Sequence, residues 1–298
     1  MKSLLFTGGT GFLGRNAKPI LDKTYMVTTI GISDNDEIKA NLATEIPSLP
    51  NRFDVILHAA GKAHVYPTTE EEKKSFYDIN LQGTINLCSA LEHVGLPESL
   101  IFISTMNVYG ETPGNMDTET TRKLIGDSPY SDSKIKAEKY LTDWCKTNGV
   151  ILGILRPGLL VGSNAPGNLG AMVTGIKTGR YLNIDGGKAR KSMLMAEDIG
   201  NLVPLIAMKG GVFNVCDDYN PSFGELSKVI ARQLGKREPI SIPYWIAKCL
   251  AKIGDYIQMF PINSSRLSKI ITSDTWSNAK AKDELGWQPM DVLTNFKI

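Results

Sequence analysis

A glycine-rich segment near the start of the chain, TGGTGFLG, limits most strongly what this sequence can fold into. It follows a short apolar stretch at Lys2–Phe6, predicted to be a buried strand, and precedes an apolar-periodic stretch at Phe12–Leu21, predicted to be a helix. Gly8, Gly11 and Gly14 permit a tight turn and bring backbone N–H groups close to a pyrophosphate at the helix N-terminus. The pattern therefore predicts a βαβ unit that binds a dinucleotide.

The same alternation of strands and helices continues along the chain. Further strands are predicted at Tyr25–Ile30, Asp54–His58, Leu100–Ser104 and Val150–Arg156, and helices at about Phe76–His93 and Pro129–Lys146. Strands that alternate with helices of this length indicate an α/β fold with a doubly wound parallel sheet of the Rossmann type.

The alternation of apolar strands and periodic helices ends after Pro157. Residues 162–190 have little periodicity, and the chain reads as mostly helical from Pro221 onward. We therefore predict a cofactor-binding domain at 1–164 and about 193–217, and a smaller, mainly helical substrate-binding domain at 165–192 and 218–298.

Composition excludes several classes of protein. The 298 residues contain 33 Lys+Arg and 31 Asp+Glu, a formal charge of +2, which gives no electrostatic reason to expect nucleic acid as a partner. No basic run suggests a polybasic membrane patch. No apolar segment has the length of a membrane span, so we expect a cytoplasmic protein without a membrane partner. Four separate cysteines without metal-ligand spacing predict reduced thiols in or near the core, and no metal site.

A tyrosine and a lysine four residues apart, Tyr130 and Lys134, share one face of the predicted helix. A lysine ammonium near a phenol lowers the tyrosine pKa and suits it to proton transfer. The spacing alone is not specific, because Tyr244 and Lys248 repeat it. Thr105, at the end of a predicted strand where such sheets place active sites, favours Tyr130 and Lys134 as the catalytic pair.

The end of the second predicted strand lacks an acidic residue. In NAD-binding folds an acid there holds the adenosine ribose, but this chain has Gly31, with Asp34 three residues later. The loss removes a charge that would repel a 2′-phosphate, yet no nearby arginine would attract one. The choice between NAD and NADP therefore stays open.

Several motifs occur together in a familiar order. They are TGGTGFLG, HAAG (His58–Gly61), DINLQGT, STMNVYG, YSDSK and LRPGLLVG. In this order and spacing the chain resembles the extended short-chain dehydrogenases/reductases, specifically the NAD-dependent epimerase/dehydratase group that acts on nucleotide sugars. The resemblance runs from about Ser3 to Trp287.

The resemblance implies a role for each matching residue. Tyr130 is the acid/base, Lys134 tunes it and binds the nicotinamide ribose, and Thr105 binds the reacting oxygen of the sugar, with Ser104 beside it. Gly8, Gly11 and Gly14 form the pyrophosphate loop. Further cofactor contacts that the resemblance implies are Phe12, Leu13, Ala59, Ala60, Asn80 and Pro157.

Substrate contacts are also implied by the resemblance. Asn168 matches a position that contacts the diphosphate of the nucleotide sugar. Arg190 or Lys191 stands where the family holds that diphosphate with a cation, and Arg266 is a further candidate. The family also implies a homodimer through the helices at about 76–93 and 129–146.

Two reactions fit the motifs equally well. Related dehydratases and decarboxylases carry acids after the catalytic threonine, whereas this chain has Met106 and Asn107, which cannot exchange protons in those roles. A UDP-hexose or UDP-N-acetylhexosamine 4-epimerase therefore stands beside an NADPH-dependent 4-keto-sugar reductase for surface polysaccharide precursors. A non-catalytic NAD(P)-binding regulatory protein is the alternative of another class.

Overall fold

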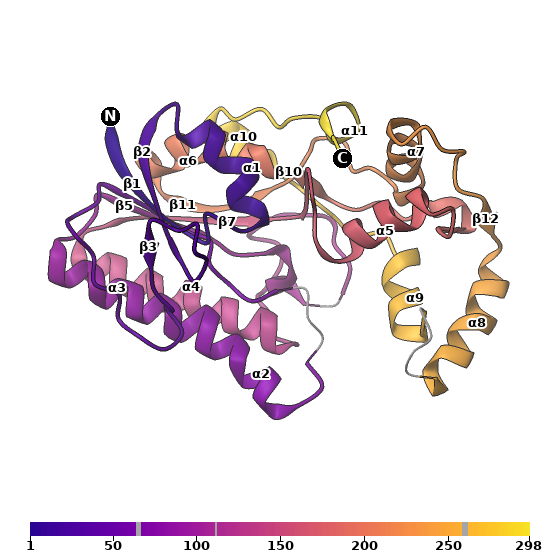
Figure 1. Ribbon diagram of the computed structural model, residues 1–298, viewed down its shortest axis with the longest axis horizontal. Coiled ribbons are helices and arrows are strands. Elements are labelled where there is room, and N and C mark those ends of the chain that lie inside the picture. The colour runs from indigo at the N-terminus through magenta and orange to yellow at the C-terminus, as the bar shows by residue number, and fades with distance from the viewer. Residues whose placement is uncertain (64–66, 111, 258–261) are drawn as a thin grey trace.

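Seven parallel strands form one sheet through the centre of the cofactor-binding part (Figure 1). The computed structural model describes residues 1–63, 67–110, 112–257 and 262–298. In spatial order the strands are β11 (Gly211–Val215), β7 (Ile151–Pro157), β5 (Ser99–Ile103), β4 (Val55–His58), β1 (Lys2–Thr7), β2 (Tyr25–Gly31) and β3 (Ile38–Lys39). The chain winds outward from β1 in one direction and then from β4 in the other. The predicted doubly wound α/β fold is confirmed, and its switch point lies between β1 and β4.

Alternation along the central strands gives the sheet two apolar faces. Leu4 and Phe6 of β1 join a core on one face, whereas Leu5 between them joins a core on the other. Both faces are covered, as parallel sheets require. The helices on one face are α1 (Phe12–Leu21), α6 (Ala196–Lys209) and α10 (Ala279–Leu285), and those of the other layer are α2 (Glu70–Tyr77), α3 (Gly83–Val94) and α4 (Pro129–Asn148) (Figure 1).

The helix predicted at Phe76–His93 differs from the observed one in two ways. It begins six residues earlier, because Thr69 and Glu72 form a capping box at its N-terminus. It is also interrupted by a π-helical turn, η1 (Asp78–Gln82), between α2 and α3. The charged first turns lack an apolar period, so periodicity alone does not reveal them.

The remaining elements build the C-terminal part. They are α5 (Gly167–Lys177), α7 (Phe223–Gln233), α8 (Tyr244–Tyr256), α9 (Ser264–Ile271), α11 (Val292–Asn295) and the 3₁₀ turn η3 (Asp185–Gly187). Short parallel pairs join β8 (Leu159–Val161) to β10 (Met193–Met195), β9 (Asn183–Ile184) to β12 (Ser241–Ile242), and β6 (Asn115–Asp117) to β13 (Thr275–Trp276). Helix α5 lies in the stretch of little periodicity. Its glycines obscure an apolar stripe of Leu169, Met172 and Ile176, which packs in one core with α7.

The cysteines agree only in part with the sequence prediction. All four are free, and Cys88, Cys145 and Cys216 are buried. Cys249 is exposed on α8, so the prediction of a position in or near the core is wrong there. Among the described helices, none has the length and apolar character needed to cross a membrane.

Candidate active site

The glycine loop between β1 and α1 adopts a backbone that larger residues would not tolerate. Gly8 has a φ of +74°, and a Cβ there would lie 3.0 Å from the Ala60 amide nitrogen. A Cβ on Gly14 would lie 1.9 Å from the Gly9 carbonyl oxygen, so α1 can pack this closely only with glycine. Gly11 is the N-cap of α1, so Phe12 and Leu13 lie in its first turn. The loop and the helix N-terminus together form a cradle for a pyrophosphate.

A directional chain of hydrogen bonds supports this loop from below. The Thr7 hydroxyl oxygen accepts from the backbone N–H groups of Ala59 (3.1 Å) and Ala60 (2.9 Å) and lies 2.7 Å from His58 Nδ1. Its proton is therefore donated to His58. Burial, together with the charge of Lys134, lowers the pKa of His58 to about 3, which leaves the ring neutral. His58 thus couples β1 to β4 instead of transferring protons.

A carboxylate from the following loop lies beside Gly31, where the acid is missing. A Cβ on Gly31 would lie 2.5 Å from Asp36 Oδ2, so this carboxylate occupies the space beside the end of β2. The same oxygen accepts from Ser33 N (3.1 Å) and from the Thr10 hydroxyl of the glycine loop (3.2 Å). The second oxygen, Asp36 Oδ1, is buried without a hydrogen-bond partner. An unpaired buried acceptor next to the pyrophosphate cradle fits a ribose hydroxyl donor.

Two of the three predicted catalytic residues are in contact. Thr105 follows β5 and caps the 3₁₀ turn η2 (Met106–Tyr109), where its hydroxyl accepts from Asn107 N at 3.2 Å. Tyr130 lies in the first turn of α4, which begins with a capping box at Ser128. Burial raises the pKa of Tyr130, and a hydrogen bond with the Thr105 side chain lowers it in part. The two hydroxyls therefore point to one place at the carboxyl end of β5.

Lys134 lies one turn further along α4 and is almost fully buried. Its ammonium donates to the Ile103 carbonyl at 2.8 Å and lies 4.5 Å from the Phe102 ring centroid. Burial lowers the pKa of Lys134 to about 8, and the charge of Glu138 opposes this effect. An ammonium with little hydration at this position stabilises a phenolate more strongly than an exposed lysine would.

Asn80 connects the π-helical turn to the lysine. Its side-chain amide donates to Ser133 Oγ (2.9 Å) and to the Lys62 carbonyl (3.2 Å), and its oxygen accepts from Lys62 N (2.7 Å). These bonds fix Gly61, where a Cβ would lie 3.2 Å from Lys134 Nζ. The wide turn η1 lets Asn80 point toward α4, as π-turns at functional sites often do.

A buried ion pair lies behind the catalytic residues. Arg156 at the end of β7 donates to both carboxylate oxygens of Glu138, at 3.0 and 2.5 Å, and the two side chains are 7% and 5% exposed. Ser104 also donates to Glu138, at 2.5 Å. The Ser104 hydroxyl is therefore engaged in this buried network, away from the Thr105 hydroxyl.

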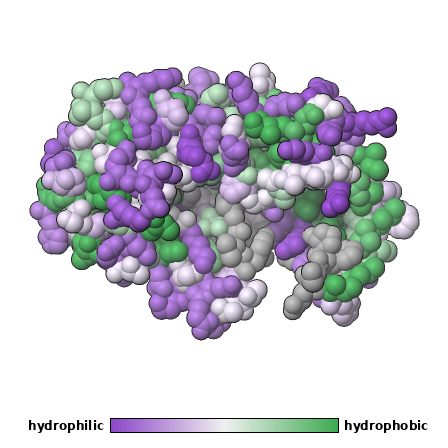
Figure 2. Space-filling view, viewed as in Figure 1, coloured by the Kyte–Doolittle hydropathy of each residue, from purple (hydrophilic) through white to green (hydrophobic). Residues whose placement is uncertain are grey.

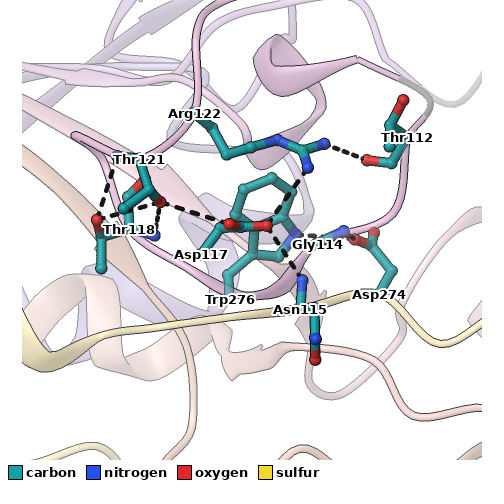
Figure 3. A network of polar contacts seen from close by, with 9 residues as sticks. All are labelled: Thr112, Gly114, Asn115, Asp117, Thr118, Thr121, Arg122, Asp274 and Trp276. Atoms are coloured by element: carbon teal, nitrogen blue, oxygen red, sulfur yellow. Dashed lines mark hydrogen bonds and ion pairs between the residues drawn. The ribbon is translucent and has the colours of Figure 1, made fainter.

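The network continues into the C-terminal part through aromatic side chains. Arg156 donates to the Tyr109 hydroxyl at 2.9 Å, and the Tyr109 ring stacks on Trp276 with centroids 4.4 Å apart. Trp276 and Asp274 also hold the segment before α4, as Figure 3 shows. Asp274 accepts from Gly114 N (2.8 Å) and from Trp276 Nε1 (2.9 Å).

Arg122 connects the segment at 112–122 to Trp276. Its guanidinium donates to the Thr112 carbonyl (2.6 Å) and to Asp117 (3.4 Å), and it lies 5.5 Å from the Trp276 ring (Figure 3). Residues 112–122, which precede Tyr130 in the sequence, are thereby held against β13 of the C-terminal part.

The predicted substrate contacts lie on separate elements. Asn168 is exposed in the first turn of α5. Arg190 donates to the Asn220 carbonyl at 2.8 Å and pairs with Glu225 at 3.5 Å, whereas Lys191 is directed to Asp274 at 4.0 Å. Arg266 lies in the first turn of α9. The two neighbouring cations thus contact different partners and do not converge here. Pro157, a predicted cofactor contact, ends β7 at the same edge of the sheet as Thr105.

Comparison with known proteins identifies the family. The model of the NAD-dependent epimerase/dehydratase family matches residues 4–216, well over half of the chain. The chain belongs to this family. That membership makes it an NAD(P)-dependent enzyme.

Relatives of this epimerase/dehydratase-family chain have several activities. It is 29% identical to a UDP-glucose 4-epimerase of Vibrio cholerae, over 98% of this chain and 92% of that protein. It is 26% identical to N-acetyl-alpha-D-glucosaminyl-diphospho-ditrans,octacis-undecaprenol 4-epimerase of Escherichia coli O157:H7, over 81% and 76%. It is also 25% identical to a GDP-6-deoxy-D-mannose reductase of Pseudomonas aeruginosa, over 76% and 79%.

Solved structures share the fold. The NADPH complex of RMD from Pseudomonas aeruginosa superimposes with a TM-score of 0.75 at 21% identity, covering 98% of this chain and 95% of that one. UDP-glucose 4-epimerase from Thermotoga maritima, with UDP-glucose, gives a TM-score of 0.74 at 20% identity, with the same coverage.

Three residues of the candidate site in this family member were not predicted from the sequence. Asp36 lies five residues beyond the expected ribose acid, in a loop whose path the sequence does not reveal. Glu138 and Arg156 leave a weak signal, since Glu138 follows Lys134 by one helical turn and Arg156 is a charge within an apolar strand. A buried charge of that kind requires a partner, but the sequence does not show which one.

Proposed function

We propose that the protein is an NAD-dependent 4-epimerase of sugars carried on a nucleoside diphosphate. The observation that carries this proposal is the Thr105–Tyr130–Lys134 cluster beside a cradle whose ribose acid is Asp36. The cofactor, when bound, accepts a hydride from sugar C4 and returns it. The absence of acids after Thr105, where Met106 and Asn107 stand, argues against elimination of water.

Each residue of the cluster has a defined task in this proposal. Tyr130 takes the proton of the C4 hydroxyl as the hydride leaves, and gives a proton back when the hydride returns to the other face of the ketone. Thr105 holds the same sugar oxygen through its hydroxyl. Lys134 supplies a positive charge that favours the phenolate of Tyr130 and so opposes the effect of burial on its pKa.

Substrate binding is assigned to the C-terminal part. Arg190, whose side chain is 44% exposed, is the candidate cation for the diphosphate, and Asn168 is its candidate amide partner. Lys191 and Arg266 stay candidates for the same group. The relatives named above act on sugars joined to a diphosphate, and this supports the substrate class.

We also propose a cytoplasmic homodimer. Four free cysteines, three of them buried, suit a reducing compartment. Helices α3 and α4 are the candidate contact surface, as the family resemblance implies.

The preference for NAD over NADPH gives a sharp prediction. We expect wild-type protein to bind NADH much more tightly than NADPH, because the Asp36 carboxylate would repel a 2′-phosphate and accept from a 2′-hydroxyl. Asp36→Asn should weaken NADH binding by about tenfold or more, the value of a charge-assisted hydrogen bond. It should also reduce the difference between the dissociation constants for NADH and NADPH. Cofactor fluorescence titration measures both dissociation constants.

Asp34 provides the matched control for this substitution. It carries the same charge two residues away but is 90% exposed and paired with Lys39. Asp34→Asn should leave both dissociation constants within about twofold. Equal affinity of wild-type protein for NADH and NADPH would reject Asp36 as the ribose acid.

Isotope tracing distinguishes epimerisation from reduction. A UDP-hexose or UDP-N-acetylhexosamine deuterated at C4 should give its 4-epimer with the deuterium retained and without added cofactor, because the same hydride returns to C4. The reductase has one observation in its favour, since burial raises the pKa of Tyr130 and so favours the phenol that a ketone reduction needs. A requirement for added NADPH, consumed one for one with a 4-keto sugar, would replace the epimerase proposal by the reductase.

A further inference from the structure

Helix α8 carries a stripe of large side chains that no described part of the chain covers. Trp245, Ile253 and Tyr256 are 66%, 48% and 91% exposed, and their spacing of three and eight residues puts them on one face of the helix. The exposed Cys249 lies on the same face. Figure 2 shows hydrophobic residues along the edge of the molecule that α8 forms in Figure 1.

The opposite face of α8 is held firmly. Ala247 and Ala251 are buried against Leu267 of α9, in a small core of their own. The stripe is therefore not the inner side of a poorly packed helix, because the helix already has its inner side. An exposed apolar patch of this kind marks an interaction surface.

Two lysines lie on the exposed side of α8. Lys252 lies within the stripe, four residues before Tyr256, and Lys248 lies at its edge, where its Nζ is 5.9 Å from the Tyr244 ring centroid. Asp255, the one acid within α8, is turned to α9, where it accepts from Ser264 N (2.8 Å) and Ser264 Oγ (2.5 Å). The exposed side of α8 thus combines aromatic and aliphatic side chains with lysines in and beside the stripe.

This combination matches the surface of an anionic bilayer. Tryptophan and tyrosine have an apolar body and a polar tip that suit the headgroup region, and lysine stems bury along the helix while their ammonium groups reach lipid phosphates. A second copy of the chain fits less well, because a two-fold contact through the stripe would bring the four lysines of two α8 helices together.

We propose that α8 docks the protein on anionic membrane surfaces, with its stripe in the headgroup layer. The 13 residues of α8 span about 20 Å, too short to cross a hydrocarbon core of about 30 Å, so the helix lies on the surface. The expectation of no membrane partner rests on the absence of a spanning segment and of a basic run in the sequence. A surface contact needs no spanning segment, and the lysines of α8 are brought together by the helix rather than by a run. The proposal does not depend on which reaction the active site performs.

Vesicle binding by the full-length chain tests the proposal. We expect the protein to sediment with vesicles of phosphatidylcholine and phosphatidylglycerol in a 3:1 ratio and much less with phosphatidylcholine alone, and added salt should weaken the binding. Trp245 gives a second readout, because Trp144, Trp276 and Trp287 are at most 7% exposed. Anionic vesicles should therefore protect the acrylamide-quenchable fluorescence of the wild-type protein.

Two double substitutions distinguish the contribution of the aromatic side chains from that of the lysines. Trp245→Ala/Tyr256→Ala should reduce binding to anionic vesicles by about tenfold or more, and Lys248→Gln/Lys252→Gln should remove the preference for anionic lipid. Met208→Ala, at an equally exposed apolar position on α6, and Lys23→Gln/Lys146→Gln, on the cofactor-binding part, should change neither. Circular dichroism confirms that each variant is folded.

Two results would overturn the proposal. One is wild-type protein that does not bind anionic vesicles, or that binds them equally well with the Trp245/Tyr256 double substitution. The other is protection of Trp245 that rises with protein concentration in the absence of lipid, which would assign the stripe to a second copy of the chain.

Discussion

Tyr130→Phe should lower turnover by about 10²- to 10⁴-fold, the usual contribution of a positioned acid–base group. The substitution removes only the hydroxyl that hydrogen-bonds with the Thr105 side chain. The aromatic ring, whose centroid lies 6.2 Å from that of Phe76, keeps its packing. Binding of the nicotinamide cofactor should change by less than about threefold, because the cradle and Lys134 stay intact. Steady-state kinetics with the accepted nucleotide sugar, together with cofactor titration, measures both effects.

The chain contains its own control for this experiment. Tyr244 and Lys248 have the same spacing as Tyr130 and Lys134, but Tyr244 is 42% exposed at the start of α8. Tyr244→Phe should leave turnover unchanged, which shows that burial beside β5 and not the spacing creates the acid–base group. Full activity of Tyr130→Phe would refute the proposed chemistry.

Glu138→Gln should destabilise the fold by about 3–5 kcal/mol, because it leaves the Arg156 guanidinium buried without a counter-charge. The side chain keeps its size, so the loss does not come from a cavity. Urea unfolding monitored by circular dichroism measures it. The double substitution Glu138→Gln/Arg156→Met should recover most of the loss, since the uncompensated charge is then absent. Glu98→Gln, which breaks an exposed pair with Lys2, should cost less than about 1 kcal/mol.

The same substitution should change the pH dependence of turnover. The charge of Glu138 raises the pKa of Lys134 against the larger effect of burial, and the result is about 8. Without that charge the pKa of Lys134 falls further, so the ammonium is lost at lower pH as the solution becomes more alkaline. The alkaline limb of the pH–rate profile should therefore move to lower pH. An unchanged limb in a folded Glu138→Gln protein would limit Glu138 to a structural role.

The cofactor-binding part was predictable because its signals are local. The glycine loop, the apolar strands and the helix that carries Tyr130 and Lys134 are each specified within about twenty residues of sequence. The start of α2 and the helix α5 were missed for an equally local reason. The first turns of α2 are charged and so show no apolar period, and glycines interrupt the apolar period of α5.

The proposed ribose acid and the proposed substrate cations were harder to predict because they depend on distant parts of the chain. Asp36 reaches the end of β2 only through the conformation of the loop at 32–37, which propensity does not specify. Arg190 and Lys191 are adjacent in sequence, yet the first is held near α7 and the second near Asp274. Convergence of side chains is a property of tertiary packing, and a single sequence does not reveal it.

The contact between residues 112–122 and Trp276 has a consequence for how such an enzyme can change during evolution. The segment that leads into the catalytic helix is supported by a strand near the far end of the chain, so the two cannot vary independently. A substitution at Asp274 or Trp276 also alters the support of the segment that leads to Tyr130. We therefore expect changes at this contact to lower turnover as well as stability, and changes outside it to be tolerated more easily.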